Sequence, residues 1–308
     1  MSNGQPVLPP AQHQTSVPAE EQINSGSAGV IVERTAQLKA GYHAEGRKFG
    51  RMIAEYVNTK QVGVATVYLF EETFGTKDKL HWLIQLGSLA DYETMVRMGT
   101  QDEEYRGNLK ADQVSAERGG GGWDKMFVDG SFTETVLMPQ FWGMYGTRVD
   151  GQVERQTRQY LQDAPITSLP GAREQVALPA SQVLHSGNAG IILHRTAIID
   201  YDFRSEGRKF ARECAESINE NLAGEATVFV YEEAFGTADR IHWLIQLKEL
   251  TSYYRLLELH VKNEKVRNMY FEERIAPERG GGTWARMFVP ASMTDVALTP
   301  HHWGMYAT

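Results

Sequence analysis

The 308-residue chain has a formal net charge of −8, with 42% hydrophobic and 23% charged residues, which is typical of a globular protein. It has neither the clustered Lys and Arg that phosphate binding needs nor an apolar run near the ~20 residues that cross a bilayer, so we expect no nucleic acid and no membrane as partner. Its single cysteine, Cys214, excludes an intrachain disulfide, and the first residues show no signal pattern, so we expect a cytoplasmic protein.

The order of expected elements is β-α-β-β-α-β, read from hydrophobic periodicity and from turn residues such as Gly75. Pro139 disfavours a central strand and predicts an edge element around it. We expect helices over 44–58 and 91–108, strands over 28–35, 65–73, 80–86 and 123–128, and an edge element over 136–145.

The same pattern occurs twice. Residues 28–147 align without a gap with residues 189–308, and the segment HWLIQL at 81–86 recurs at 242–247. A repeat of this length that occurs only twice indicates two fused domains rather than a solenoid. We therefore expect three parts, namely a first module with its N-terminal arm (1–147), a connection (148–161) and a second module with its arm (162–308).

This order of elements is the ferredoxin-like arrangement. It resembles the dimeric α/β-barrel superfamily, which includes antibiotic-biosynthesis monooxygenases, polyketide cyclases, muconolactone isomerases, haem-degrading monooxygenases and chlorite dismutases. In that superfamily two sheets close face to face around a cavity. The resemblance therefore implies an α+β fold in which tandem duplicated ferredoxin-like modules form a pseudo-dimeric α/β barrel within one chain.

The hairpin around Gly75 places candidate catalytic residues together. With 75–78 as the turn, Glu72 lies opposite His81 on one face of the sheet, and Glu233 lies opposite His242 in the second module. A carboxylate beside an imidazole orients the ring and raises its basicity, which suits a general base near neutral pH. A structural ion pair is the alternative interpretation, and the extra histidines of the second module favour His242 as the more active base.

Polar and aromatic residues on the same face are candidates for substrate binding, because strand alternation directs them toward the predicted cavity. The repeated Trp of the WGMY segment is a further candidate for stacking on a planar ligand. The candidates are Gln85, Gln246, Tyr68, Phe70, Phe229, Tyr231, Trp142 and Trp303.

A metal site is an alternative in the second module. Three imidazoles and a carboxylate form a legitimate set for a first-row transition metal. The set would be His194, His242, Glu233 and His302. The superfamily resemblance also leaves haem open, because some members use a histidine ligand.

We therefore expect a small-molecule enzyme of secondary metabolism. The resemblance implies a cofactor-independent monooxygenase or a cyclase that acts on an aromatic or polyketide-like substrate, as in antibiotic biosynthesis, with the His–Glu pair as general base. The alternatives are a metal-dependent oxygenase and a non-enzymatic protein that binds the same small molecules. No partner besides the substrate is expected, apart from a second copy of the chain in a homodimer.

Overall fold

The computed structural model describes residues 8–141 and 166–302. Eight antiparallel strands close into a barrel in the order β1-β3-β2-β8-β5-β7-β6-β4, and β4 pairs back with β1. The strands are β1 (Val30–Gln37), β2 (Ala65–Phe74), β3 (Lys79–Leu86), β4 (Thr133–Pro139), β5 (Ile191–Ile198), β6 (Ala226–Phe235), β7 (Arg240–Leu247) and β8 (Thr294–Pro300).

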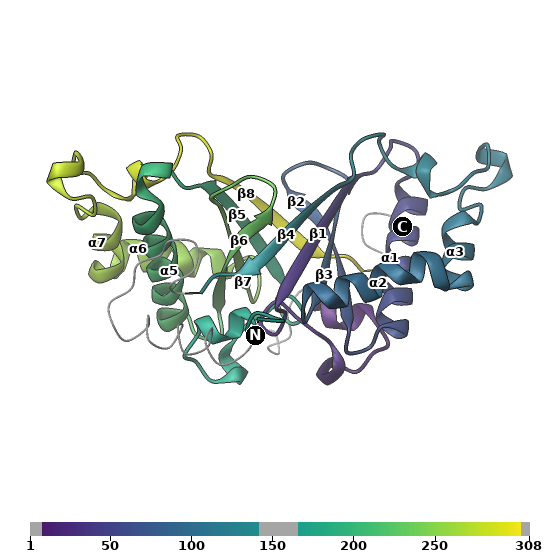
Figure 1. The fold of residues 1–308 in the computed structure, drawn as a ribbon, viewed down its shortest axis with the longest axis horizontal. Helices are drawn as coiled ribbons and strands as arrows, with labels where there is room; N and C mark the ends of the chain where they lie inside the picture. Colours follow the sequence, from purple (N-terminus) through teal and green to yellow (C-terminus); the bar gives the residue numbers. More distant parts are fainter. Residues whose placement is uncertain (1–7, 142–165, 303–308) are drawn as a thin grey trace.

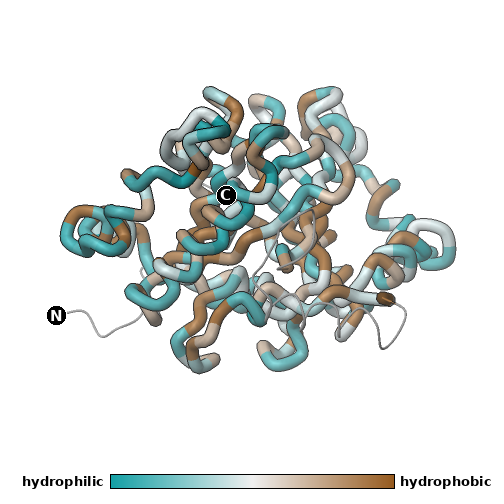
Figure 2. Tube along the Cα trace, turned by 60° about the vertical axis from the view of Figure 1, so that its left-hand side comes forward, coloured by the Kyte–Doolittle hydropathy of each residue, from teal (hydrophilic) through white to brown (hydrophobic). Residues whose placement is uncertain are grey.

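Helices cover the outside of the barrel on two opposite sides (Figure 1). The first half contributes α1 (His43–Lys60), α2 (Leu89–Gln101) and α3 (Glu103–Lys110), and the second contributes α5 (Arg204–Asn221), α6 (Ser252–Lys262) and α7 (Glu264–Phe271). Apolar stretches run through the middle of the molecule, and hydrophilic stretches are frequent around it (Figure 2). In the part of the chain that the structure describes, no helix is long and apolar enough to span a membrane.

The two halves repeat the same pairings. Val30 lies opposite Leu86 in the first half, and Ile191 lies opposite Leu247 in the second, at corresponding positions of the aligned segments. Within each half the strand orders are β4-β1-β3-β2 and β8-β5-β7-β6. The halves join where β2 pairs with β8 and β4 pairs with β6, so hydrogen-bonded ladders run continuously around the barrel.

Three expected elements differ from the structure. The predicted strand at 123–128 is a 3₁₀ helix, Trp123–Met126, because Trp123 stacks on Phe49 of α1 instead of pairing in the sheet. The fourth strand is β4, which the edge prediction placed near Pro139, and Pro139 is its last residue, where proline is tolerated. The predicted second helix is divided at Asp102, whose side chain caps α3 by accepting from the Tyr105 backbone N–H.

The segments before β1 and β5 close one end of the barrel. Gln14 binds both the backbone N–H and the carbonyl of Leu69, and Gln175 makes the corresponding bonds to Val230. Each segment also reaches the other half, since the Gln12 N–H donates to the Gly187 carbonyl at 2.8 Å. The segments therefore belong to the packed structure.

Candidate functional site

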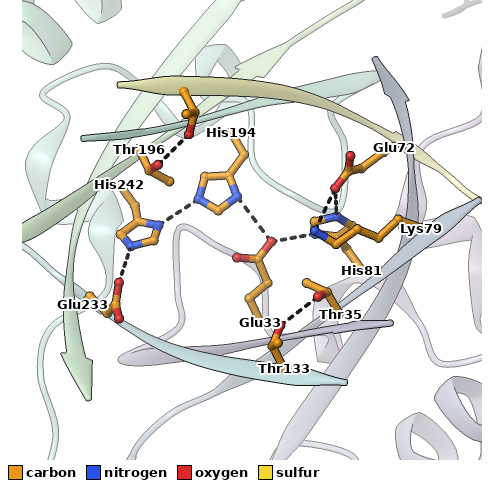
Figure 3. A network of polar contacts seen from close by, with 11 residues as sticks. Glu33, Thr35, Glu72, Lys79, His81, Thr133, His194, Thr196, Glu233 and His242 are labelled. Carbon is orange, nitrogen blue, oxygen red and sulfur yellow. Dashed lines mark hydrogen bonds and ion pairs between the residues drawn. The ribbon is translucent and has the colours of Figure 1, made fainter. Parts of the chain in front are cut away.

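A chain of six carboxyl and imidazole groups crosses the barrel interior (Figure 3). Their side chains are no more than 7% exposed. In order along the chain they are Glu72, His81, Glu33, His194, His242 and Glu233.

The contacts along this chain are short at its centre. His81 Nε2 and Nδ1 lie 2.8 Å from Glu72 and 2.7 Å from Glu33, and His194 Nδ1 lies 3.2 Å from the same Glu33 oxygen. His194 Nε2 lies 2.9 Å from His242 Nδ1. His242 Nε2 and Glu233 are 3.4 Å apart, which is the weakest link. Glu33 belongs to the first half and His194 to the second, so the chain connects the two.

The predicted contacts Glu72–His81 and Glu233–His242 are present, although the predicted register was wrong by two residues. Phe70, not Glu72, lies opposite His81. The end of β2 leaves β3 and pairs with β8 through a bulge between Glu72 and Phe74. Glu72 stays on the face of His81 because a shift of two residues preserves the side-chain alternation.

The repeated FGT turn holds each glutamate in place. The Thr76 backbone N–H donates to the Glu72 carboxylate, and the Thr237 N–H donates to Glu233 at 2.6 Å. Gly75 has a φ of +146°, and a Cβ there would meet the Glu72 carboxylate. Glycine is therefore required by both the backbone conformation and the close approach of the side chain.

The two equivalent histidines have opposite pKa shifts. Burial acts to lower the pKa of His81, but the carboxylates of Glu33 and Glu72 outweigh it and raise the pKa. The pKa of His242 is lowered, first by burial and also by the charge of His194, against the opposing hydrogen bond to Glu233. Burial likewise acts to raise the pKa of Glu33, yet His194 and His81 hold it well below its usual range.

The His194–His242 pair makes three contacts that each need a proton. His194 Nδ1 faces the carboxylate of Glu33 and His242 Nε2 faces that of Glu233, so each of these nitrogens must carry a proton to donate. The contact between the two rings needs a third proton. Two neutral imidazoles hold only two such protons, so two neutral rings can donate in only two of these three contacts.

The predicted substrate-binding residues that the structure describes are packed inside the barrel, each at most 1% exposed. Gln85 donates to Ser186 at 2.6 Å, and Gln246 donates to Ser25 at 3.3 Å. The hydroxyl of Tyr68 donates to Gln22. The side chains Tyr68, Phe70, Phe229 and Tyr231 belong to one apolar cluster in the interior. They fill the space in which the sequence predicted a cavity. Trp142 and Trp303 lie outside the described residues.

The alternative metal set is not assembled. His194, His242 and Glu233 are neighbours, but His302 Nε2 instead contacts the Pro9 carbonyl at 2.5 Å. Within residues 8–141 and 166–302, no group of three or more His, Cys, Asp or Glu side chains has a geometry that would hold a metal ion. The prediction of this metal site is therefore wrong for the described residues, because the imidazoles bind one another and the carboxylates.

A cavity of about 360 Å³ lies on the other face of the first-half sheet, between the strands and helices α1, α2 and α3. Its volume and apolar character suit a small-molecule site. Phe49, Trp82, Trp123 and Phe132 provide aromatic walls. Arg34 and Tyr105 provide polar groups. Trp82 follows His81 in β3, so the cavity and the His–Glu chain lie on opposite faces of the same strand.

The corresponding space in the second half is filled by larger side chains. His260 and Tyr270 stand at the positions of Gly99 and Leu109, and His260 Nε2 lies 2.9 Å from the Tyr270 hydroxyl. Tyr270 also packs edge-on against Phe210 and Trp284. At Gly99, by contrast, an added Cβ would meet no atom within 4 Å. The open site is therefore in the first half, whereas the sequence favoured the second.

Sequence reasoning missed the cavity because its walls come from many segments that lie far apart in the sequence. The difference between Gly99 and His260, at aligned positions of two similar segments, could have indicated a cavity in the first half. Sequence reasoning also missed a buried ion pair, in which Arg47 is 3% exposed and lies 2.6 Å from Glu71. Both residues recur in the second half as Arg208 and Glu232, and that shared repetition could have revealed the pair.

The strands and helices define an α+β protein with a closed eight-stranded antiparallel barrel, which is the barrel fold that the resemblance implied. The chain belongs to a family described as a family of unknown function (DUF6039), whose model matches residues 1–306. Comparison with curated proteins gives no match.

Solved structures of similar shape share little sequence with this chain. A protein assigned as a monooxygenase from Fusobacterium nucleatum has 6% identity and a TM-score of 0.49, over 91% of this chain and 93% of that one. An anthrone oxidase-like protein has 8% identity and a TM-score of 0.47, over 91% and 94%. A chlorite dismutase from Candidatus Nitrospira defluvii has 10% identity and a TM-score of 0.41, over 89% and 92%.

The expectation of a site without a cofactor is corrected by these comparisons, because the similar chlorite dismutases depend on haem. The described residues do not fit a haem, either in the first-half cavity or at the His–Glu chain inside the barrel. The lining of the first-half cavity includes no histidine. Both ring nitrogens of His81, His194 and His242 already contact neighbouring side chains. No chemical step is therefore assigned to a haem.

Proposed function

We propose that this protein is an oxygenase-type enzyme or a cyclase that binds a small aromatic or polyketide-like molecule in the first-half cavity. The observation that carries this proposal is the contrast between the halves: aligned positions that leave a cavity beside Gly99 are filled by His260 and Tyr270 in the second half. A cavity beside Gly99, where the second half has two large side chains, is expected if this half binds a ligand.

The chain contributes binding, orientation and exclusion of water. Phe49 and Trp123 are stacked, with their ring planes 9° apart, and Trp82 lies on the same cavity wall. Flat aromatic walls favour a planar ligand by stacking and by burial of its apolar surface. A dry cavity also strengthens every polar contact that the ligand makes there.

We further propose that the barrel is a single-chain pseudo-dimer of two ferredoxin-like modules, covering 1–147 and 162–308. The strand orders β4-β1-β3-β2 and β8-β5-β7-β6 support this proposal, because both are the ferredoxin-like order. The His–Glu chain then lies at the interface between the modules. The sequence-based prediction that His81, Glu72, His242 and Glu233 are catalytic is the alternative to a reaction in the cavity.

The test uses the full chain with a panel of hydroxylated anthrones and naphthols, followed by oxygen consumption and mass spectrometry of the products. Gly99→His should lower kcat/KM at least about tenfold by filling the cavity as His260 does. Gly107→Asn is the matched control, because it also introduces the second-half residue but at an exposed position outside the cavity. Binding without turnover would indicate a binding protein. Equal activity in all three proteins would contradict the proposed site. The absorbance spectrum of the purified protein reports whether haem copurifies.

A further inference from the structure

The polar groups of the first-half cavity are few, and two of them lie close together. Arg34 and Tyr105 both line the cavity, and the charge of Arg34 acts on the Tyr105 hydroxyl. The Trp82 indole N–H, by contrast, already donates to the Gly50 carbonyl at 3.2 Å. The remaining wall is mostly apolar, so a ligand oxygen has one polar corner at which to bind.

The ion pair of Arg34 with Glu134 occupies only some of the N–H donors of the guanidinium. Its Nε and Nη2 atoms both contact a single oxygen of Glu134, whose other oxygen accepts from the Tyr92 hydroxyl at 3.3 Å. The equivalent Arg195 is held more completely, because Asp295 binds Nε and Nη2 with separate oxygens at 2.7 and 2.8 Å. A guanidinium has five N–H donors, so Arg34 retains donors on Nη1. Tyr92 is a further hydrogen-bond partner of Arg34, whereas no hydrogen bond of the Tyr105 hydroxyl is present among the described residues.

We propose that the cavity selects planar phenols or enols bound as their oxyanions, with the charged oxygen at Arg34 and Tyr105 and the rings among Phe49, Trp82 and Trp123. This inference rests on the proposed function, since it names the substrate class of the same site. A hydrogen bond from a guanidinium to an oxyanion is charge-assisted and roughly twice as strong as a neutral one. Partial burial raises the pKa of the Tyr105 hydroxyl, which therefore keeps its proton and can donate it to an anion.

The probe pair is 2-hydroxy-1,4-naphthoquinone, whose enol ionises at neutral pH, and 2-methoxy-1,4-naphthoquinone, which has the same rings but cannot ionise. Isothermal titration calorimetry should show the hydroxy compound binding at least about tenfold more tightly to the wild-type chain. Arg34→Met should bring the two affinities together by weakening only the hydroxy compound. Arg195→Met, the equivalent change in the second half, should preserve the tenfold preference.

Glu134→Gln keeps the test decisive if Arg34→Met misfolds. This change removes the anion that competes for Arg34, so affinity for the hydroxy compound should increase while that for the methoxy compound stays constant, and misfolding does not produce such a gain. Equal binding of both compounds, with Gly99→His abolishing both, would overturn the oxyanion proposal and leave the cavity as the site. Absence of binding by either compound would contradict the proposed function itself. A preference that survives Arg34→Met in a folded protein would also overturn the inference.

Discussion

Glu33 and His194 occupy the same position in the two halves, and they contact each other at 3.2 Å across the barrel. Two glutamates at this position would repel, and two histidines would leave His81 without one of its carboxylates. The difference between the halves therefore creates a complementary pair at their interface.

Exchanging these two residues tests the complementarity. The single variants Glu33→His and His194→Glu should each lower the free energy of unfolding by about 3–5 kcal/mol, because each leaves a buried charge without its partner. The double variant should recover most of that loss. Urea denaturation of the four proteins gives the coupling energy directly. Additive losses in the double variant would show that the contact contributes nothing specific.

His81 and His242 should give stability opposite dependences on pH. The pKa of His81 is raised in the folded state, so its contribution is complete below the usual imidazole value of about 6.5 and is lost as the pH rises through the raised pKa. The pKa of His242 is lowered, so the unfolded chain takes up a proton below about pH 6.5 that the folded chain does not, and stability falls there.

The matched variants are His81→Gln and His242→Gln, each compared with the wild type by urea denaturation from pH 5 to 9. His81→Gln should flatten the loss of stability on the alkaline side, and His242→Gln should flatten part of the loss on the acidic side. Identical pH profiles for the two variants would contradict the opposite pKa shifts of His81 and His242.

Gly75→Ala should destabilise the protein by about 1–3 kcal/mol, because it places a Cβ at positive φ against the Glu72 carboxylate. Gly63→Ala is the control, since Gly63 also has positive φ but open space around the added atom. Thermal melting gives the stability, and the imidazole resonances of His81 report its pKa, which should fall only in Gly75→Ala. Equal effects at both positions would mean that backbone strain alone matters.

The catalytic prediction for the inner-face histidines can be separated from the cavity proposal. A general base contributes about 10²–10⁴-fold in rate. Because His81 and His242 lie inside the barrel, away from the cavity, we expect kcat to stay within about tenfold in His81→Ala and His242→Ala while the melting temperature falls. A loss of 10²-fold or more in folded His242→Ala would place the chemistry inside the barrel and support the original prediction.

Opening the second half is the converse experiment to Gly99→His. His260→Gly with Tyr270→Leu should create an apolar space beside Phe210 and Trp284. A second binding event in calorimetry is expected, together with a loss of stability of about 2–5 kcal/mol from the deleted side chains. A stability loss without new binding would show that an open cavity in the second half is not sufficient for ligand binding.

Local patterns predicted the β-α-β-β-α-β order and the contact between Glu72 and His81, because strand alternation and turn residues act over a few positions. The hairpin register could not be predicted, because it depends on the pairing of β2 with β8 from the other end of the chain. Burial of the predicted substrate residues was missed for a similar reason: Gln22 and Ser25, far from them in sequence, bind Tyr68 and Gln246. The contact of Glu33 with His194 could not be predicted from either half alone, because it forms only where the two halves pack together.

The reciprocal contacts of the arms have a consequence for how the molecule is built. The Gln12 N–H bonds to Gly187, and the Arg173 N–H bonds to Gly26, so each half is completed by a segment of the other. Together with the strand ladders β2–β8 and β4–β6, these noncovalent contacts join the halves independently of the peptide segment that connects them. Two co-expressed polypeptides, divided within the segment that joins the halves, should therefore copurify as one barrel, whereas either alone would expose open sheet edges and aggregate.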